Sequence, residues 1–100
     1  MARKLPELLE GLLDTKKLQQ LLTDWQEQTV LESVAVKAAA EARAEVTPAD
    51  LPAVMAQLAA GTIVGVQVRY TFDERAWCDT VMRQGKKFRL IRSDVTHPGR

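Results

Sequence analysis

Leucines at helical spacing dominate the start of the chain. They recur three or four residues apart at Leu5, Leu8, Leu9, Leu12 and Leu13. This spacing predicts a helix over residues 5–13. Asp14 and Thr15 interrupt the pattern and provide a new N-cap, so a second helix is expected over residues 16–23.

The next segment is rich in alanine and contains neither glycine nor proline until residue 48. Alanine is the best helix former, so we expect residues 24–45 to be helical. Thr23 followed by Gln26 resembles a capping box, which would begin a separate helix at Asp24. The alternative is one continuous helix over residues 16–45, and the sequence leaves both open.

The clearest helix signal lies in the middle of the chain. Thr47 is a favourable N-cap, Pro48 suits the first helical position, and Asp50 follows the cap by three residues. Gly61 is suited to the left-handed position that ends a helix. These signals predict a helix over residues 48–60.

Beyond Gly61 the hydrophobic period changes from 3.6 to two. The apolar positions of the first alternating segment are Val64, Val66, Val68, Tyr70 and Phe72. Alternation with β-branched and aromatic residues predicts strands over residues 63–72, 76–83 and 87–93, joined by short polar turns.

Together these elements predict an α+β fold. Three or four N-terminal helices would pack on one face of a C-terminal three-stranded antiparallel β-meander. Residues 1–95 would form a single domain, and residues 96–100 would form a flexible tail.

The first turn of the meander decides which side chains share a face. A three-residue turn at residues 73–75 places Tyr70 opposite Cys78 and Arg69 opposite Asp79, an ion pair across strands. We therefore expect this turn. The predicted core face is Val66, Val68, Tyr70, Phe72, Cys78 and Met82.

The opposite face of the predicted meander combines one large aromatic residue, two aliphatic residues and three arginines. Its candidate partner-binding residues are Arg69, Trp77, Val81, Arg83, Arg89 and Ile91. Tryptophan and arginine are enriched in interaction surfaces. The alternative is that a helix from the first half covers Trp77, Val81 and Ile91.

Charge suggests a second kind of partner. The net charge is only +1, but residues 1–50 carry six Lys/Arg against nine Asp/Glu, and residues 51–100 carry eight against four. A basic run surrounds the second turn and comprises Arg83, Lys86, Lys87, Arg89 and Arg92. Phosphate binding requires such a cluster, so a nucleic-acid-binding module is the alternative function.

Catalytic and metal-binding patterns are scarce. His97 is the only histidine and Cys78 the only cysteine, and no Gly-rich phosphate loop or nucleophile elbow is present. We expect no enzyme activity, no cofactor and no metal. A second alternative is a small-molecule or enzymatic pocket between helices and sheet that involves Cys78, Asp79 and Tyr70.

The apolar runs are short and interrupted, which predicts neither a membrane span nor a secretory signal. A single cysteine fits a reducing compartment, so we expect a cytoplasmic protein. The leucine surplus also favours self-association as a homodimer. The sequence thus predicts a non-enzymatic interaction, accessory or assembly protein, and matches no family pattern that would identify the partner.

Overall fold

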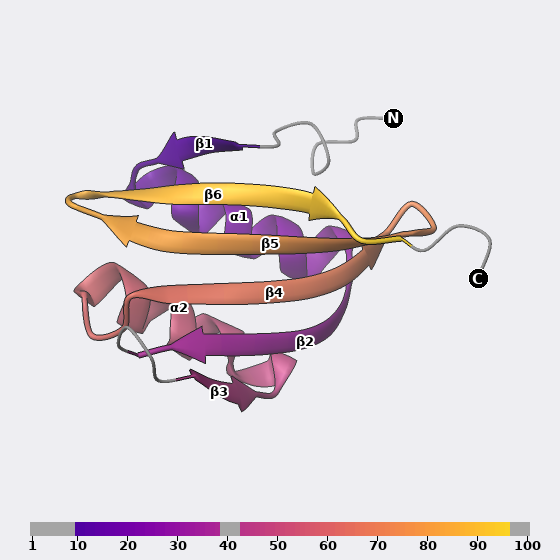
Figure 1. The fold of residues 1–100 in the computed structure, drawn as a ribbon, viewed down its shortest axis with the longest axis horizontal. Helices are drawn as coiled ribbons and strands as arrows, with labels where there is room; N and C mark the ends of the chain where they lie inside the picture. Colours follow the sequence, from indigo (N-terminus) through magenta and orange to yellow (C-terminus); the bar gives the residue numbers. More distant parts are fainter. Residues whose placement is uncertain (1–9, 39–42, 97–100) are drawn as a thin grey trace.

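The computed structural model describes residues 10–38 and 43–96. These form one six-stranded antiparallel sheet with both α-helices on the same face (Figure 1). The strands are β1 (Glu10–Leu13), β2 (Val30–Lys37), β3 (Arg43–Val46), β4 (Gly65–Phe72), β5 (Arg75–Gln84) and β6 (Lys87–Asp94). The helices are α1 (Thr15–Gln28), η2 (Pro48–Asp50, a 3-10 turn) and α2 (Leu51–Ala60). The strand order is β1-β6-β5-β4-β2-β3.

The expected fold class is therefore wrong. The sheet has six strands instead of three, and the described chain has two α-helices instead of three or four. The three strands predicted between residues 63 and 93 are present as β4, β5 and β6, but they form only the middle of a larger sheet.

The largest error concerns the segment 24–45. Helix α1 ends at Gln28, and the chain continues as strands β2 and β3, so neither one long helix nor two helices span residues 16–45. Strand β2 pairs with β4 on one side and with β3 on the other. Its alternation of Val34 and Val36 with smaller or polar neighbours suits a half-buried strand, and the two ladders override the local helix propensity of alanine.

The predicted helix over residues 5–13 is also wrong where it can be compared. Glu10–Leu13 form β1, which pairs with β6, the last strand of the chain. Residues 5–9 lie outside the described residues. Leu13 is buried opposite Phe88, so its burial comes from a partner 75 residues away in sequence, which local spacing does not reveal.

The start of α1 and both ends of the helical segment 48–60 carry the capping residues that the sequence indicates, whereas the end of α1 at Gln28 was not predicted. The Asp14 carboxylate accepts a hydrogen bond of 2.8 Å from the Lys17 backbone N–H and caps α1. The Asp50 carboxylate accepts hydrogen bonds from the Thr47 backbone N–H and hydroxyl at 3.3 and 3.0 Å before α2. Gly61 ends α2 with φ 86°.

The register of β4 and β5 differs from the expected one. The turn contains two residues, Asp73 and Glu74, with φ of 57° and 65°, as in a type I′ turn. Tyr70 therefore lies opposite Trp77, not Cys78. Because one residue of slip reverses every side chain of a strand, β5 presents its other face to the helices.

This correction divides the predicted core face. Strand β4 buries its residues as predicted, whereas Cys78 and Met82 lie on the face away from the helices. The expected Arg69–Asp79 ion pair does not form, because these side chains lie on opposite faces. Trp77 becomes buried instead, and burying a large aromatic ring contributes more than an exposed ion pair.

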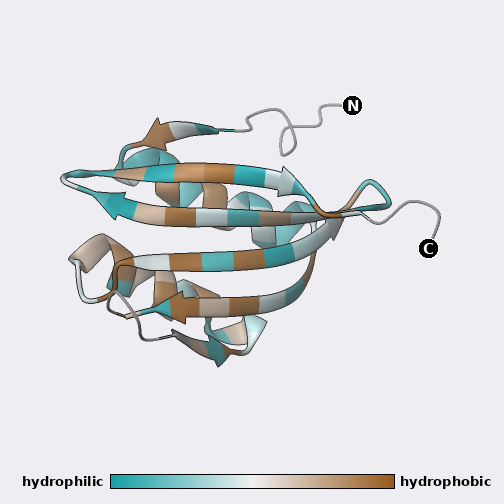
Figure 2. Cartoon of the chain, in the orientation of Figure 1, coloured by the Kyte–Doolittle hydropathy of each residue, from teal (hydrophilic) through white to brown (hydrophobic). Residues whose placement is uncertain are grey.

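Two layers bury one continuous apolar core. Apolar and polar residues alternate along the strands, as the banding in Figure 2 shows. Side chains from the helix-facing side of the sheet pack against the inner faces of α1 and α2. The residues fully buried there include Trp25, Leu18, Leu51, Leu58, Val34, Val66, Val68, Tyr70, Val81, Phe88 and Leu90.

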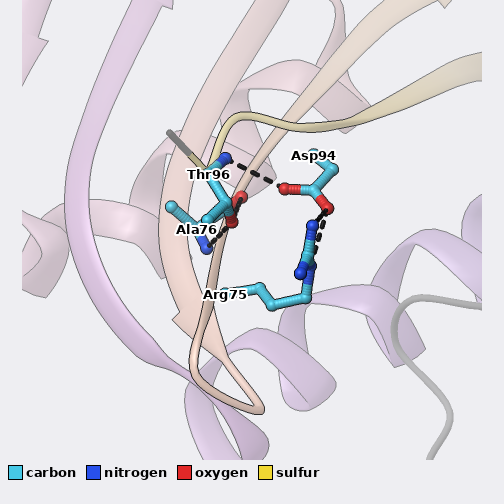
Figure 3. Close-up of polar contacts among 4 residues, drawn as sticks. All are labelled: Arg75, Ala76, Asp94 and Thr96. Atoms are coloured by element: carbon cyan, nitrogen blue, oxygen red, sulfur yellow. Dashed lines mark hydrogen bonds and ion pairs between the residues drawn. The ribbon is translucent and has the colours of Figure 1, made fainter. Parts of the chain in front are cut away.

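The chain remains anchored to the sheet through Thr96. The Thr96 hydroxyl accepts a hydrogen bond of 2.8 Å from the Ala76 backbone N–H, and Asp94 accepts one of 2.9 Å from the Thr96 N–H (Figure 3). Arg75 pairs with Asp94 beside them. Thr96 is thus not part of a free tail, and the other predicted tail residues, 97–100, lie outside the described residues.

Within the described ranges, no helix has both the length and the apolar composition needed to cross a membrane.

Candidate interaction surface

The sheet has one face without helices, which Figure 1 views from the front. We call it the open face. It is formed by every second residue of the strands, and no described helix lies over it. The open face is the surface from which an interaction site can be built.

The six predicted partner-binding residues do not share this face. Arg69, Arg89 and Ile91 lie on it. Trp77 and Val81 lie beneath the helices and are buried. For these two residues, the alternative that a helix covers the predicted surface is therefore correct.

Arg83 also lies on the helix-facing side, at the end of β5. It donates hydrogen bonds of 3.2 and 3.0 Å to the backbone carbonyls of Leu58 and Ala59, and its guanidinium lies 5.8 Å from the centre of the Phe88 ring. These carbonyls belong to the C-terminal end of α2, where a cation is favourable. Arg83 therefore caps a helix.

The predicted basic run is divided in the same way. Arg92 is buried beneath the helices and Arg83 caps α2, while Lys86 lies in the exposed turn between β5 and β6. Lys87 and Arg89 lie on the open face, where Arg89 pairs with Glu10 of β1. The five cations do not form one patch.

The strand register arranges the open face in rows that run across the sheet. The central row, from β1 to β3, reads Glu10, Ile91, Thr80, Gln67, Ala35 and Glu45. The adjacent row begins with Leu12, Arg89, Met82, Gly65 and Lys37. The middle of the face is thus uncharged, with acidic residues at both ends of the central row.

Apolar side chains project from the β1–β6 side of the open face. Leu12 is 53% exposed and Ile91 is 42% exposed. They belong to adjacent strands, and Leu12 pairs with Arg89, two residues from Ile91. Large aliphatic side chains next to each other in water form a small apolar projection.

The β4–β2 side of the same face is hollowed. A shallow depression of about 120 Å³ is lined by Ala35, Val36, Lys37, Val66, Gln67, Thr80 and Met82. A Cβ atom at Gly65 would collide with the Met82 sulfur, so glycine allows this side chain to lie across β4.

A buried polar network lies on the opposite, helix-covered face. Asp79 is fully buried and accepts hydrogen bonds from Trp25 Nε1 at 2.9 Å and from the Tyr70 hydroxyl at 3.0 Å. Arg92, only 5% exposed, donates through Nε and Nη2 at 2.8 Å each, a bidentate ion pair. Each carboxylate oxygen therefore accepts two hydrogen bonds.

The network sets the protonation states of its members. Burial, followed by the negative charge of Asp79, raises the pKa of the Tyr70 hydroxyl above its ordinary value. Burial alone would disfavour the Arg92 cation, but the hydrogen bonds and charge of Asp79 outweigh it and raise the pKa of Arg92. Tyr70 thus remains a neutral donor and Arg92 a cation.

This arrangement does not form the pocket expected from Cys78, Asp79 and Tyr70. Cys78 lies on the open-face side of β5, whereas Asp79 and Tyr70 point toward the helices. The Asp79 carboxylate is saturated with donors and sealed from solvent. The network therefore ties α1 to the sheet through Trp25.

The sequence interpretation gave Arg92, a network member, a different role, in the basic run, and it connected neither Arg92 nor Trp25 with Asp79. The signal that could have identified them is the choice of which alternate residues of β5 face the helices. With a two-residue turn, Asp79 falls among buried positions, and a buried carboxylate requires a cation and further donors. Among the described residues, no three histidine, cysteine, aspartate or glutamate side chains come together as a metal site.

We compared the chain with protein-family models, curated protein sequences and solved structures, and none of the three comparisons found a match.

Proposed function

We propose that this protein is a non-enzymatic interaction protein, an accessory or assembly factor, and that the open face of the sheet is its contact surface. The observation that carries the proposal is the apolar projection of Leu12 and Ile91 beside a depression in the sheet centre. We place its action in the reducing cytoplasm, because Cys78 is the only cysteine of the chain.

A bare sheet face alone would not support this proposal, since antiparallel sheets commonly have one solvated face. Such faces are normally covered by polar side chains. Here large aliphatic residues project next to a depression whose lining is uncharged except for Lys37, which suits contact with a complementary protein surface.

Nucleic acid is less well supported as the ligand. Single-stranded nucleic acids are usually bound by aromatic side chains that stack on bases from an open sheet. All five aromatic residues of this chain are buried, including Trp77, which the sequence interpretation placed outside. The basic residues are also divided between two faces.

Affinity capture from an extract of the native cell tests the proposal. The tagged wild-type chain is compared with Ile91→Arg, which places a charge on the open face, and with Ala53→Arg, which places the same charge on exposed α2. Circular dichroism first verifies that all three are folded. We expect Ile91→Arg to lose the proteins that the wild type and Ala53→Arg recover. Equal recovery by all three would contradict the open face as the contact surface.

A further inference from the structure

We propose that the partner of the open face is a second copy of this chain, packed face to face about a twofold axis that runs along β5. This inference rests on the proposed function and identifies the partner. It follows from three properties of the open face: its shape, its charges and its area.

The shape of the face is self-complementary about β5. The twofold axis superposes β6 of one copy on β4 of the other and β1 on β2, because these strands lie at equal distances on either side of β5. Ile91 lies on β6 in the same row as Gln67 of β4. The exposed Ile91 of each copy therefore meets the depression of the other, as an isologous interface requires.

The charges are also complementary under this rotation. Glu10 of β1 comes to lie over Ala35 of the second copy, next to Lys37 in the following row. Each interface would then contain two Glu10–Lys37 pairs.

Two of the remaining cations come to lie over uncharged residues. Arg89 comes to lie over Gly65 and Arg69 over Ser93. The residues on the axis itself are Cys78, Thr80 and Met82, which carry no ionised group that would face its own copy. The axis itself therefore brings no like charges together, whereas Arg89 of one copy comes to lie beside Lys37 of the other, the cross-strand partner of Gly65.

The face is large enough for a specific dimer. Four strands about 4.8 Å apart and about 26 Å long, together with the four-residue β1, provide roughly 550 Å² of projected area on each copy. Side-chain relief increases the contact area toward the roughly 800 Å² per partner of a standard interface. A second copy thus covers the face without any further element.

Light scattering coupled to size-exclusion chromatography tests the dimer with the full chain from low to high micromolar concentration. We expect the wild type and Ala53→Arg to be dimeric and Ile91→Arg to be monomeric. Circular dichroism verifies that each variant is folded. A wild-type chain that is monomeric throughout this range would overturn the inference.

Charge reversal tests the arrangement independently of the burial of Ile91. In a homodimer of Glu10→Lys, positions 10 and 37 are both basic, and in a homodimer of Lys37→Glu both are acidic. We expect each variant to dissociate at least about tenfold more readily than the wild type. In a mixture of the two, every contact is between opposite charges, so heterodimers should form. A mixture that remains as weakly associated as its components would overturn the proposed axis.

The experiments distinguish failure of the homodimer from failure of the open face as a contact surface. If the chain is monomeric but partner capture still depends on Ile91, a different protein covers the open face, and only the identity of the partner is overturned. If neither dimerisation nor capture depends on Ile91, the open face is not the contact surface and both proposals fail.

Discussion

At the scale of single residues, Asp79 is fully buried and accepts four hydrogen bonds. Its carboxylate compensates the buried Arg92 cation and accepts the indole N–H of α1. Removing one member of a buried ion pair leaves the other charge unpaired in a low-dielectric environment.

We expect Asp79→Asn to lower the free energy of unfolding by about 3–5 kcal/mol, because the amide retains the size of the carboxylate but not its charge. Urea unfolding followed by circular dichroism measures this loss. Asp94→Asn is the matched control, since Asp94 pairs with Arg75 at the surface. The control should lose far less stability, and equal losses would contradict the role of burial.

A second prediction for a single residue concerns the effect of low pH on stability through Asp14. The hydrogen bond from the Lys17 backbone N–H lowers the pKa of the Asp14 carboxyl below its ordinary value. The ionised form therefore stabilises the fold above the unfolded-state pKa of about 3.9, and this contribution is lost as pH falls through the lowered pKa.

Asp14→Asn separates capping from ionisation, because asparagine is an equally good N-cap. We expect it to retain stability at neutral pH and to lose less stability than the wild type on acidification from about pH 5 to pH 2. Urea unfolding at a series of pH values measures the difference. Parallel pH curves for the two proteins would show that Asp14 does not titrate with folding.

At the scale of elements, the two hairpin turns differ in how their residues tolerate positive φ. Glu74 adopts φ 65° in the β4–β5 turn, where only glycine incurs no steric cost, and Gly85 adopts φ 63° in the β5–β6 turn. The first turn thus retains strain that the second avoids.

Glu74→Gly should raise the free energy of unfolding by about 1 kcal/mol, because glycine relieves the left-handed strain. Gly85→Ala should lower it by a similar amount, although no atom lies within 4 Å of the added Cβ. Thermal and urea unfolding measure both changes. A destabilised Glu74→Gly would show that the Glu74 side chain has a role other than forming the turn.

The elements also show which local signals were sufficient. Thr47, Asp50 and Gly61 define a helix by capping alone, and α2 follows the prediction. Residues 24–45 contain both an alanine-rich pattern and the alternating Val34 and Val36. Pairing with β4 and β3 favoured the strand.

The register error at residues 73–75 displaced Trp77 and Val81 from the predicted surface, while Arg89 and Ile91 remained on it.

At the scale of the whole molecule, the first described strand, β1, pairs with the last, β6. Leu13 pairs with Phe88, whereas Val68 pairs with Asp79 across a short hairpin. Closing a long loop costs more chain entropy than closing a hairpin, so the β4–β5 pair should form earlier in folding.

Leu13→Ala and Val68→Ala both remove buried methyl groups and should each destabilise the protein. We expect Leu13→Ala to act mainly by faster unfolding and Val68→Ala mainly by slower folding. Stopped-flow kinetics over a range of urea concentrations distinguish these effects. Slower folding of Leu13→Ala by the same factor as Val68→Ala would show that β1 is already paired in the transition state.

The sequence by itself determined the elements whose signals are local. Capping residues and Gly61 define α2, and period-two alternation defines β4, β5 and β6. The tertiary structure alone decided that residues 10–13, 30–37 and 43–46 form strands, and that β5 turns Asp79 instead of Cys78 toward the helices. These outcomes depend on hydrogen bonds and burial between segments distant in sequence, and such interactions stabilise a conformation only once both partners are in place.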